Sequence, residues 1–475
     1  MSTRQGFTIG QGRARARTIK PATDVGVGSA QTAMQARAAV DTPGLEAELR
    51  RALQGEVRFS DGDRALYATD GSNYRQVPIG VVLPADEQDV LRTLAICRAH
   101  GAPVLARGGG TSLAGQCCNT AVIMDMTKYF NRILELDPER KLARVEPGLV
   151  LDELRSAAKK YGLTFGPDPS THNHNTLGGM IGNDSCGVHS VQSEFYGPGA
   201  RTAEQIESME VVTCDGVRMR VGATSEEELE AIIAQGGRRG EIYRAMRDLR
   251  DRYAPLIRAR YPKIIRRVSG YNLPYLLPEN GFNVARALVG SEGTLVTVLE
   301  ATVHLIHDPA KRALLVLGYP TVYDAGDHVP QLREFRPLAI EGMDDTLDHL
   351  MRKKNLLVED LKELPPGKGW IFAEFGGDTQ AEADDVARQA MEKIRAAGNA
   401  PEMILYSDAK SQDRLWTVRR SGLGATAFVP GEPLAWEGWE DTAVPVDRIG
   451  DYLRDFHALL GKYDYRTALY GHFGQ

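Results

Sequence analysis

Cysteine is scarce in this sequence, which has five among 475 residues and no pair spaced as C-x-x-C. This pattern does not predict a disulfide framework or a thiolate-bound metal cluster, and it fits a reducing compartment. Excess positive charge is also absent, because 57 Lys and Arg stand against 63 Asp and Glu, so we expect no nucleic-acid partner. No apolar run approaches the ~20 residues that cross a bilayer, and we expect no transmembrane segment. The length suggests two or three globular domains.

Acidic side chains are almost missing from the first forty residues. Six Arg and Lys occur there, and Asp24 is the only acid. This composition predicts a disordered basic tail over residues 1–40. Transit peptides share the bias, but the tail lacks their amphipathic spacing. We therefore expect a cytoplasmic protein, and a peripheral contact with the inner face of a membrane stays open.

Three successive glycines form the turn around which the chain is organised. The turn reads Arg107-Gly108-Gly109-Gly110-Thr111-Ser112 and lies between two short apolar runs. Glycine lets a ligand approach the backbone closely, and successive N–H groups in such a turn form a nest for an anion. The turn has neither the Gly-Lys-Ser/Thr ending of a P-loop nor a G-x-G-x-x-G opening a helix. A diphosphate site of another kind is indicated; an ordinary strand-to-loop turn is the alternative.

Two further segments have similar properties. Residues 166–187 contain two prolines, five glycines and many hydroxyl or amide side chains, which predict an irregular loop that lines a site for a flat, polar ligand. His172 and His174 in this loop are interpreted as surface residues rather than metal ligands. Residues 287–298 predict a strand end in which Gly290 and Gly293 permit close approach of a ligand. A plain bulged strand is the alternative there.

The apolar pattern predicts two kinds of architecture. Up to residue 310, short strands alternate with helices, and a hairpin over 209–221 carries an Asp215-Gly216 pair typical of a type I′ turn. From residue 312 onwards, strands and helices alternate in a way that suggests an antiparallel sheet backed by helices. The expected strands there are 314–317, 338–340, 370–374 and 403–406, and the expected helices are 322–335, 343–354 and 380–397.

Three motifs taken together resemble a known family. R-G-G-G-T-S-L-A-G, G-P-D-P-S-T…T-L-G-G-M-I-G-N and V-G-S-E-G-T-L occur in this order, as in the FAD-binding module of the vanillyl-alcohol oxidase (PCMH-type) flavoproteins. The branch that the chain resembles holds the flavoprotein component of glycolate oxidase and the D-2-hydroxyglutarate and D-lactate dehydrogenases. The resemblance covers roughly residues 76–475. It implies an α+β fold, with a two-lobed PCMH-type FAD-binding domain over 41–310 and an antiparallel-sheet-plus-helices cap (substrate) domain over 311–475.

The resemblance also implies the cofactor and its contacts. The first loop has no histidine to which a flavin is attached in some relatives, so we expect non-covalent FAD. The first loop is expected to hold the diphosphate, and the other two to run along the flavin and ribityl chain. The implied cofactor-binding residues are Arg107, Gly108, Gly109, Gly110, Thr111, Ser112, Gly115, Gln116, Pro167, Asp168, Pro169, Ser170, Thr171, Thr176, Gly178, Gly179, Ile181, Asn183, Asp184, Ser185, Gly187, Gly290, Glu292, Gly293 and Leu295.

The cap contributes two candidate catalytic residues. Leu415-Trp416-Thr417-Val418-Arg419 resembles the family's L-W-x-x-R signature, which places Arg419 at the substrate carboxylate, because a planar guanidinium grips a carboxylate with two hydrogen bonds. Tyr470-Gly471-His472 resembles the opening of G-H-x-G-D-G-x-x-H, whose histidines bind a divalent metal. His472 is therefore both a candidate catalytic residue and a candidate metal ligand, for Zn or Mn in the full-length protein.

The same motif suggests where the chain ends. The second histidine and the family's catalytic Glu-His pair are expected beyond Gln475, so we expect a chain truncated before the family's C-terminal motifs, with an incomplete cap. Some longer relatives continue into an iron–sulfur region. Trp439 stands where 2-hydroxyglutarate enzymes often carry a lysine, two residues before Asp441, which leaves the dicarboxylate substrate open.

The expected function is an FAD-dependent dehydrogenase that oxidises a D-2-hydroxy acid, of D-2-hydroxyglutarate or D-lactate type, to the 2-oxo acid. Hydride passes to flavin N5, and the electrons go on to a quinone, a cytochrome or an iron–sulfur partner. A non-catalytic FAD-binding subunit of a multi-component glycolate or lactate oxidase complex is the alternative. An oxidase that uses O₂ directly and a homodimer both stay open.

Overall fold

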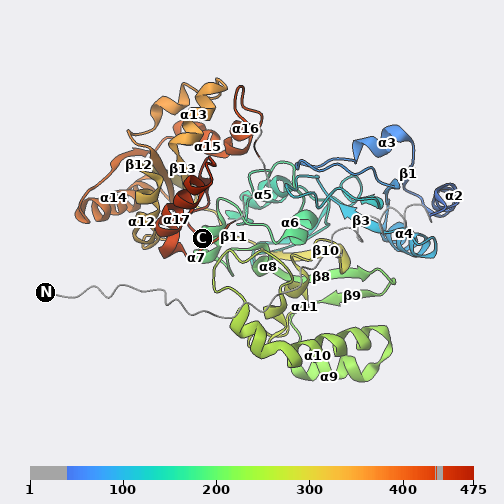
Figure 1. Cartoon of the computed structure of the whole chain (residues 1–475). Helices are drawn as coiled ribbons and strands as arrows, with labels where there is room; N and C mark the ends of the chain where they lie inside the picture. The colour runs from blue at the N-terminus through green and yellow to red at the C-terminus, as the bar shows by residue number, and fades with distance from the viewer. Residues whose placement is uncertain (1–39, 434, 436–441) are drawn as a thin grey trace, which may run out of the picture.

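The computed structural model describes residues 40–433, 435 and 442–475. The expected tail over 1–39, Trp439 and Asp441 lie outside the described residues. The chain forms an N-terminal part with two main sheets and a C-terminal part with one sheet (Figure 1).

The first sheet is small and mostly parallel. Its order is β1-β2-β4-β3, with β2 and β3 each parallel to β4 and β1 antiparallel to β2. Its strands are β1 (Glu56–Arg58), β2 (Gly80–Leu83), β3 (Val104–Arg107) and β4 (Val122–Asp125), and its helices are α2 (Thr42–Ala52), α3 (Asp61–Leu66) and α4 (Glu87–Ala99). Every residue of β2 and β4 is buried, which explains why these strands read as continuous apolar runs.

The second sheet is antiparallel and larger, with the order β5-β6-β10-β8-β9. Its strands are β5 (Ile133–Asp137), β6 (Leu142–Val145), β8 (Ile206–Thr213), β9 (Arg218–Val221) and β10 (Val296–His304). The helices of this lobe are α5 (Leu151–Lys159), α6 (Leu177–Asn183), α7 (Ser190–Tyr196), α8 (Thr202–Gln205), α9 (Glu226–Gln235), α10 (Gly237–Arg260) and α11 (Val284–Leu288). The short strands β7 (Leu163–Thr164) and β11 (Ile306–His307) pair beside it. In β10, buried and half-buried residues alternate, because one face of the sheet meets the core and the other does not.

The third sheet forms the cap and is covered on both faces. Its order is β15-β12-β14-β13-β16, entirely antiparallel. The strands are β12 (Lys311–Tyr319), β13 (Ala339–Asp344), β14 (Gly369–Gly377), β15 (Glu402–Tyr406) and β16 (Tyr470–Gly471). One face packs on α12 (Val322–Arg333), α14 (Gln380–Ala396) and α17 (Ile449–Lys462), and the other on α13 (Asp345–Lys353), α15 (Ala409–Arg420) and α16 (Gly422–Thr426).

Helix α7 joins the two parts of the molecule. It follows the second predicted loop and packs against strand β13 of the cap. Gln192 donates to the carbonyl of His307 at 2.8 Å, and Arg333 of the cap forms an ion pair with Glu194 at 2.6 Å. In Figure 1 the cap therefore lies beside α7, and β11 leads towards it.

The α+β fold and the antiparallel cap confirm the sequence predictions, but three local predictions are wrong. Residues 177–183 form helix α6 within the loop expected to be irregular, because the Thr176 hydroxyl accepts the Gly179 N–H at 3.2 Å and caps the helix. Strand β10 begins only at Val296, since the preceding residues form α11 and a glycine turn. The hairpin turn is not type I′, which needs two positive φ angles: of Asp215 and Gly216, only Gly216 has one, at 86°.

No helix in the described part of the chain is both long enough and apolar enough to cross a membrane.

The buried carboxyl group of Asp344 in the cap allows a test of how burial affects stability. Asp344 caps helix α13 and accepts the Leu347 N–H at 3.0 Å. Burial raises the pKa of Asp344 from 3.8 to about 6. Because this pKa is higher in the folded than in the unfolded chain, the ionised carboxylate destabilises the fold above about pH 6, and the penalty disappears as the pH falls towards about 4.

We therefore predict that Asp344→Asn raises the free energy of unfolding, because Asn caps a helix without carrying charge. The expected gain is about 1–3 kcal/mol at a pH of about 7.5 and close to zero at a pH of about 4. Urea denaturation at both pH values measures it. A variant that is no more stable than the parent at the higher pH contradicts the assignment.

Candidate functional site

One cleft of about 2080 Å³ receives residues from all three predicted loops and from the cap. The predicted cofactor-binding residues that line it are Gly108, Gly109, Gly110, Thr111, Ser112, Gln116, Pro169, Ser170, Thr171, Thr176, Gly179, Asn183, Asp184, Ser185, Gly290 and Glu292. Both candidate catalytic residues, Arg419 and His472, line the same cleft. Segments far apart in the chain thus meet at one place, between the N-terminal lobes and the cap.

Backbone hydrogen bonds fix the second loop against the third. The Gly290 N–H donates to the carbonyl of Ile181 at 2.8 Å, and the Glu292 N–H donates to that of Gly182 at 3.0 Å. The first loop is tied to the third because Gln116 Nε2 donates to Glu292 Oε1 at 3.3 Å. The convergence of the three loops is therefore built into the fold.

Arg107 supports the first loop from behind. Its guanidinium donates to the carbonyls of Tyr67 at 3.1 Å, Thr69 at 2.8 Å and Cys117 at 3.0 Å. Gly110 has a φ of 67°, in the left-handed region that glycine adopts without strain. Arg107 thus holds the turn in place and does not line the cleft.

Eight other predicted residues also lie outside the lining. A Cβ on Gly178 meets Pro147 at 2.6 Å, and one on Gly187 meets the backbone of Asp168 at 2.0 Å, so these glycines serve close packing of the chain. Asp168 itself is buried in an ion network described below. The remaining residues of this group are Gly115, Pro167, Ile181, Gly293 and Leu295.

The cleft fits a long, polar cofactor such as FAD. Both side-chain polar atoms of Asn175 are buried in its wall without a hydrogen-bond partner among the described residues, and such groups require a partner. A Cβ added to Gly179 meets nothing closer than the Thr176 hydroxyl at 3.4 Å, so this wall of the cleft is open for a ligand. The glycine turn supplies backbone donors beside these groups.

Arg419 and His472 are joined by a carboxylate that the sequence motifs do not include. Glu341 of β13 is fully buried. One of its oxygens lies 2.7 Å from His472 Nδ1 and the other lies 2.6 Å from Arg419. Because a carboxylate only accepts, Nδ1 carries the proton and the Nε2 lone pair of His472 is left for a ligand.

One hydrogen-bond donor of the Arg419 side chain, Nε, is not used within the described residues. Its Nε is buried and has no hydrogen-bond partner within the described residues, although the other side of the guanidinium contacts Glu341. The guanidinium also lies over the Tyr470 ring, 5.4 Å from its centroid. An anionic ligand in the cleft is the partner that this geometry leaves room for.

The donor set around His472 does not make up a metal site. Among the described residues, no group of three or more His, Cys, Asp or Glu side chains is placed to hold a metal ion. The only carboxylate that contacts His472 in this part of the chain is shared with Arg419. We therefore assign no step to a metal.

Sequence reasoning missed Glu341, Asn175 and the segment 266–271, all of which contribute to the cleft. A charged residue within the buried strand of residues 339–344 was a usable signal for Glu341, because a buried carboxylate needs partners. Asn175 lies within residues 166–187, in the short stretch that the second motif leaves out. The segment 266–271 has no pattern of its own in the sequence.

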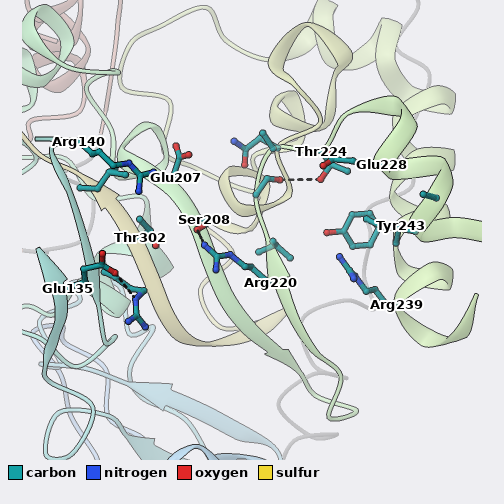
Figure 2. A pocket seen from close by; sticks show the side chains of 18 of the residues that line it. Glu135, Arg140, Glu207, Ser208, Arg220, Thr224, Glu228, Arg239, Tyr243 and Thr302 are labelled. Carbon is teal, nitrogen blue, oxygen red and sulfur yellow. Dashed lines mark hydrogen bonds and ion pairs between the residues drawn. The ribbon is translucent and has the colours of Figure 1, made fainter. Parts of the chain in front are cut away.

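A second hollow lies on the outer face of the β5-β6-β10-β8-β9 sheet, beside α9 and α10 (Figure 2). Its volume is about 790 Å³, and none of the predicted site residues lines it. Figure 2 shows side chains of both charges, among them Glu135, Arg220 and Arg239. This mixed wall does not favour one ligand charge, and the first cleft is the candidate site.

Comparison with known proteins defines the class. Residues 78–222 match the family of the FAD binding domain, and residues 308–475 match the C-terminal domain of FAD linked oxidases. The chain thus combines an FAD-binding domain with the C-terminal domain of FAD linked oxidases, and the expected PCMH-type fold is confirmed. The expected truncation is not confirmed, because the family's C-terminal domain is present in residues 308–475.

Particular relatives narrow the comparison. A D-2-hydroxyglutarate dehydrogenase of Pseudomonas putida is 31% identical over 440 residues, which cover 90% of this chain and 43% of that protein. The chain therefore spans less than half the length of this relative. A D-lactate dehydrogenase of Archaeoglobus fulgidus is 28% identical over 83% of this chain and 73% of that protein. Among solved structures, p-cresol methylhydroxylase with substrate bound shares the fold, with a TM-score of 0.53 over 81% of this chain and 71% of that chain at 15% identity.

The open wall at Gly179 generates a prediction for cofactor binding. Gly179→Val places a branched side chain in the cleft, with its Cβ no closer than 3.4 Å to any other protein atom. The bound FAD must then shift, at a cost of about 1–3 kcal/mol, or roughly tenfold or more in affinity. Titration of flavin-free protein with FAD, followed by flavin fluorescence, measures the change.

Gly62→Val is the matched control, because Gly62 lies in helix α3 and an added Cβ there meets nothing closer than 3.9 Å. This variant is expected to bind FAD like the parent. Equal FAD affinity of the two variants contradicts the placement of the cofactor along α6.

Proposed function

We propose that this chain carries the FAD-dependent dehydrogenase activity that converts a D-2-hydroxy acid to the 2-oxo acid. The observation that supports it best is the joining of Arg419 and His472 through Glu341 in the cleft that the three glycine loops line. The named activities of the Pseudomonas and Archaeoglobus relatives agree with it. The substrate is of D-2-hydroxyglutarate or D-lactate type, and the electrons leave to a quinone, a cytochrome or an iron–sulfur partner.

The three loops are proposed to hold FAD without a covalent bond. Gly108, Gly109 and Gly110 offer backbone N–H groups to the diphosphate, and Asn175 offers an amide with no other partner in the described chain. When bound, FAD accepts a hydride from the substrate. Release of the intact yellow cofactor on acid precipitation of the protein is the expected sign of non-covalent binding.

Arg419 is proposed to orient the substrate. Its guanidinium lines the cleft, where it is placed to donate to the carboxylate common to all 2-hydroxy acids. Glu341 neutralises part of the arginine charge through an ion pair at 2.6 Å. A fixed carboxylate places the C2 hydrogen of the substrate in one direction relative to the cofactor, which is the positional part of catalysis.

His472 is proposed to take the proton of the substrate hydroxyl. The contact of Nδ1 with Glu341 at 2.7 Å sets the tautomer and leaves Nε2 as the acceptor. Arg419 and His472 then act on the carboxylate and the hydroxyl of the same substrate carbon.

The direct test is anaerobic bleaching of the flavin band near ~450 nm by D-2-hydroxyglutarate, D-lactate or glycolate, since the flavin carries the redox chemistry. At least one D-2-hydroxy acid is expected to bleach it, and its L enantiomer is not. Absence of bleaching by every 2-hydroxy acid favours a non-catalytic FAD-binding subunit.

Arg419→Lys tests the substrate contact while keeping a positive charge beside Glu341. Lysine lacks the planar fork of arginine, so KM for the hydroxy acid is expected to rise about tenfold to a hundredfold, with unchanged flavin content. Steady-state kinetics and the flavin absorbance of the purified protein measure both quantities.

Arg414→Lys is the control, because Arg414 lies on the same helix α15 but contacts Asp360 and Glu363 instead of the cleft. Its KM is expected to equal that of the parent. Loss of FAD from Arg419→Lys, or equal KM values in the two variants, contradicts the proposed role of Arg419.

A further inference from the structure

A chain of buried polar groups connects the two halves of the cleft behind its walls. Asp168 and His189 come from the N-terminal part, and Glu374 of β14 and Trp416 of α15 come from the cap. His189 Nδ1 lies 2.6 Å from Asp168 Oδ2, and His189 Nε2 lies 3.0 Å from Glu374 Oε2. Trp416 Nε1 donates to the other oxygen of Glu374 at 2.9 Å.

These side chains are buried, and they contact one another through ion pairs and hydrogen bonds. All four side chains are less than a tenth exposed. Burial opposes ionisation of Glu374, but Arg312 and His189 outweigh it and lower the pKa of Glu374 to about 2. Asp168 likewise has a lowered pKa, because the charges of His189 and Arg155 overcome its burial. Arg312 contacts both Glu374 and His189 and pairs with Asp308 at 2.7 Å.

Each end of this chain of contacts leads directly to the cleft. Asp168 precedes Pro169, Ser170 and Thr171, which line it on the cofactor side. Trp416 precedes Arg419 by three residues on helix α15, so the two side chains occupy the same helix face. The Trp416 ring also lies 6.4 Å from the His189 ring, centroid to centroid. The polar contacts therefore connect the loop of residues 168–171 to helix α15, which carries Arg419.

We propose that His189 and Glu374 are positioning residues that set the place of Arg419 relative to the cofactor. Close packing holds the helix on the sheet, and a hydrogen bond to a buried charge adds a directional contact that is costly to leave unmade. Glu374 fixes α15 through the indole N–H, and His189 fixes Glu374 relative to the loop that holds the cofactor. This inference rests on the proposed function only for what Arg419 binds.

The test removes the contact between His189 of the N-terminal part and Glu374 of the cap. His189→Asn keeps a side-chain nitrogen near Asp168 and removes the ring nitrogen that reaches Glu374. Hydrogen–deuterium exchange of the full chain is expected to show about tenfold faster exchange in α15, residues 409–420, although residue 189 lies in the other part of the molecule. Exchange changes confined to residues 166–196 overturn the proposal, whatever the activity of the protein.

A double-mutant cycle on KM supplies the second readout. Trp416→Phe removes the indole donor at one end, and KM is expected to rise about tenfold with flavin content kept. The effects of Trp416→Phe and His189→Asn on KM are expected to depart from additivity by about threefold or more, because both act through Glu374. If Trp416→Phe fails to fold, Glu374→Gln, which keeps an acceptor for the indole, replaces it in the cycle.

Trp370→Phe is the matched control. Trp370 is as buried as Trp416 and donates its indole N–H to the carbonyl of Pro365 at 2.8 Å, outside the polar network. Its effect is expected to be additive with His189→Asn, and exchange in α15 is expected to stay unchanged. Additive effects in both cycles overturn the proposal. If the parent oxidises no 2-hydroxy acid, the proposed function fails. The exchange measurement alone then tests the positioning role of His189 and Glu374.

Discussion

The structure depends on the backbone hydrogen bonds that hold the loop before β10 against helix α6. Through them, Gly290 and Glu292 lie beside Ile181 and Gly182, although more than a hundred residues separate the two segments. Gly290 suits this contact because its φ of 80° lies in the left-handed region that glycine adopts without strain. These backbone hydrogen bonds, together with the contact between Gln116 and Glu292, hold together the three loops that line the cleft.

The cap contributes charged side chains to the cleft, whereas the three loops are held together mainly by backbone hydrogen bonds. Buried carboxylates are costly unless paired, and the cap uses two of them in related ways. Glu341 connects Arg419 to His472 within the cleft, and Glu374 connects Trp416 to His189 behind it. Both carboxylates come from neighbouring strands of the central cap sheet, β13 and β14, so the same rigid sheet carries the site and its support. The geometry ties the helix that carries Arg419 to the domain interface.

Much of this fold could be predicted from the residue pattern. The cap strands and helices follow the apolar periodicity closely, because β12, β13 and β14 are buried on both faces and the helices that cover them each bury one face. The three glycine motifs also identified the cleft. Glu341 escaped prediction because a single acid in an apolar strand has no motif. Helix α6 escaped because burial of Leu177, Met180 and Ile181, together with the Thr176 cap, offsets the low helix propensity of three glycines. The role of Asp168 could not be read from its motif, since its partner His189 is defined only by the folded chain.

Arg419 of the cap is proposed to bind the carboxylate of a hydroxy acid in the same cleft that holds the cofactor. The most direct measurement is the absorbance difference spectrum of the FAD-loaded chain during titration with oxalate, a dicarboxylate that resembles the 2-oxo acid product and has no hydrogen to transfer. The account predicts a saturable perturbation of the oxidised flavin band that weakens about tenfold or more in Arg419→Lys. A flavin spectrum that oxalate leaves unchanged, or perturbs equally in both proteins, would contradict it.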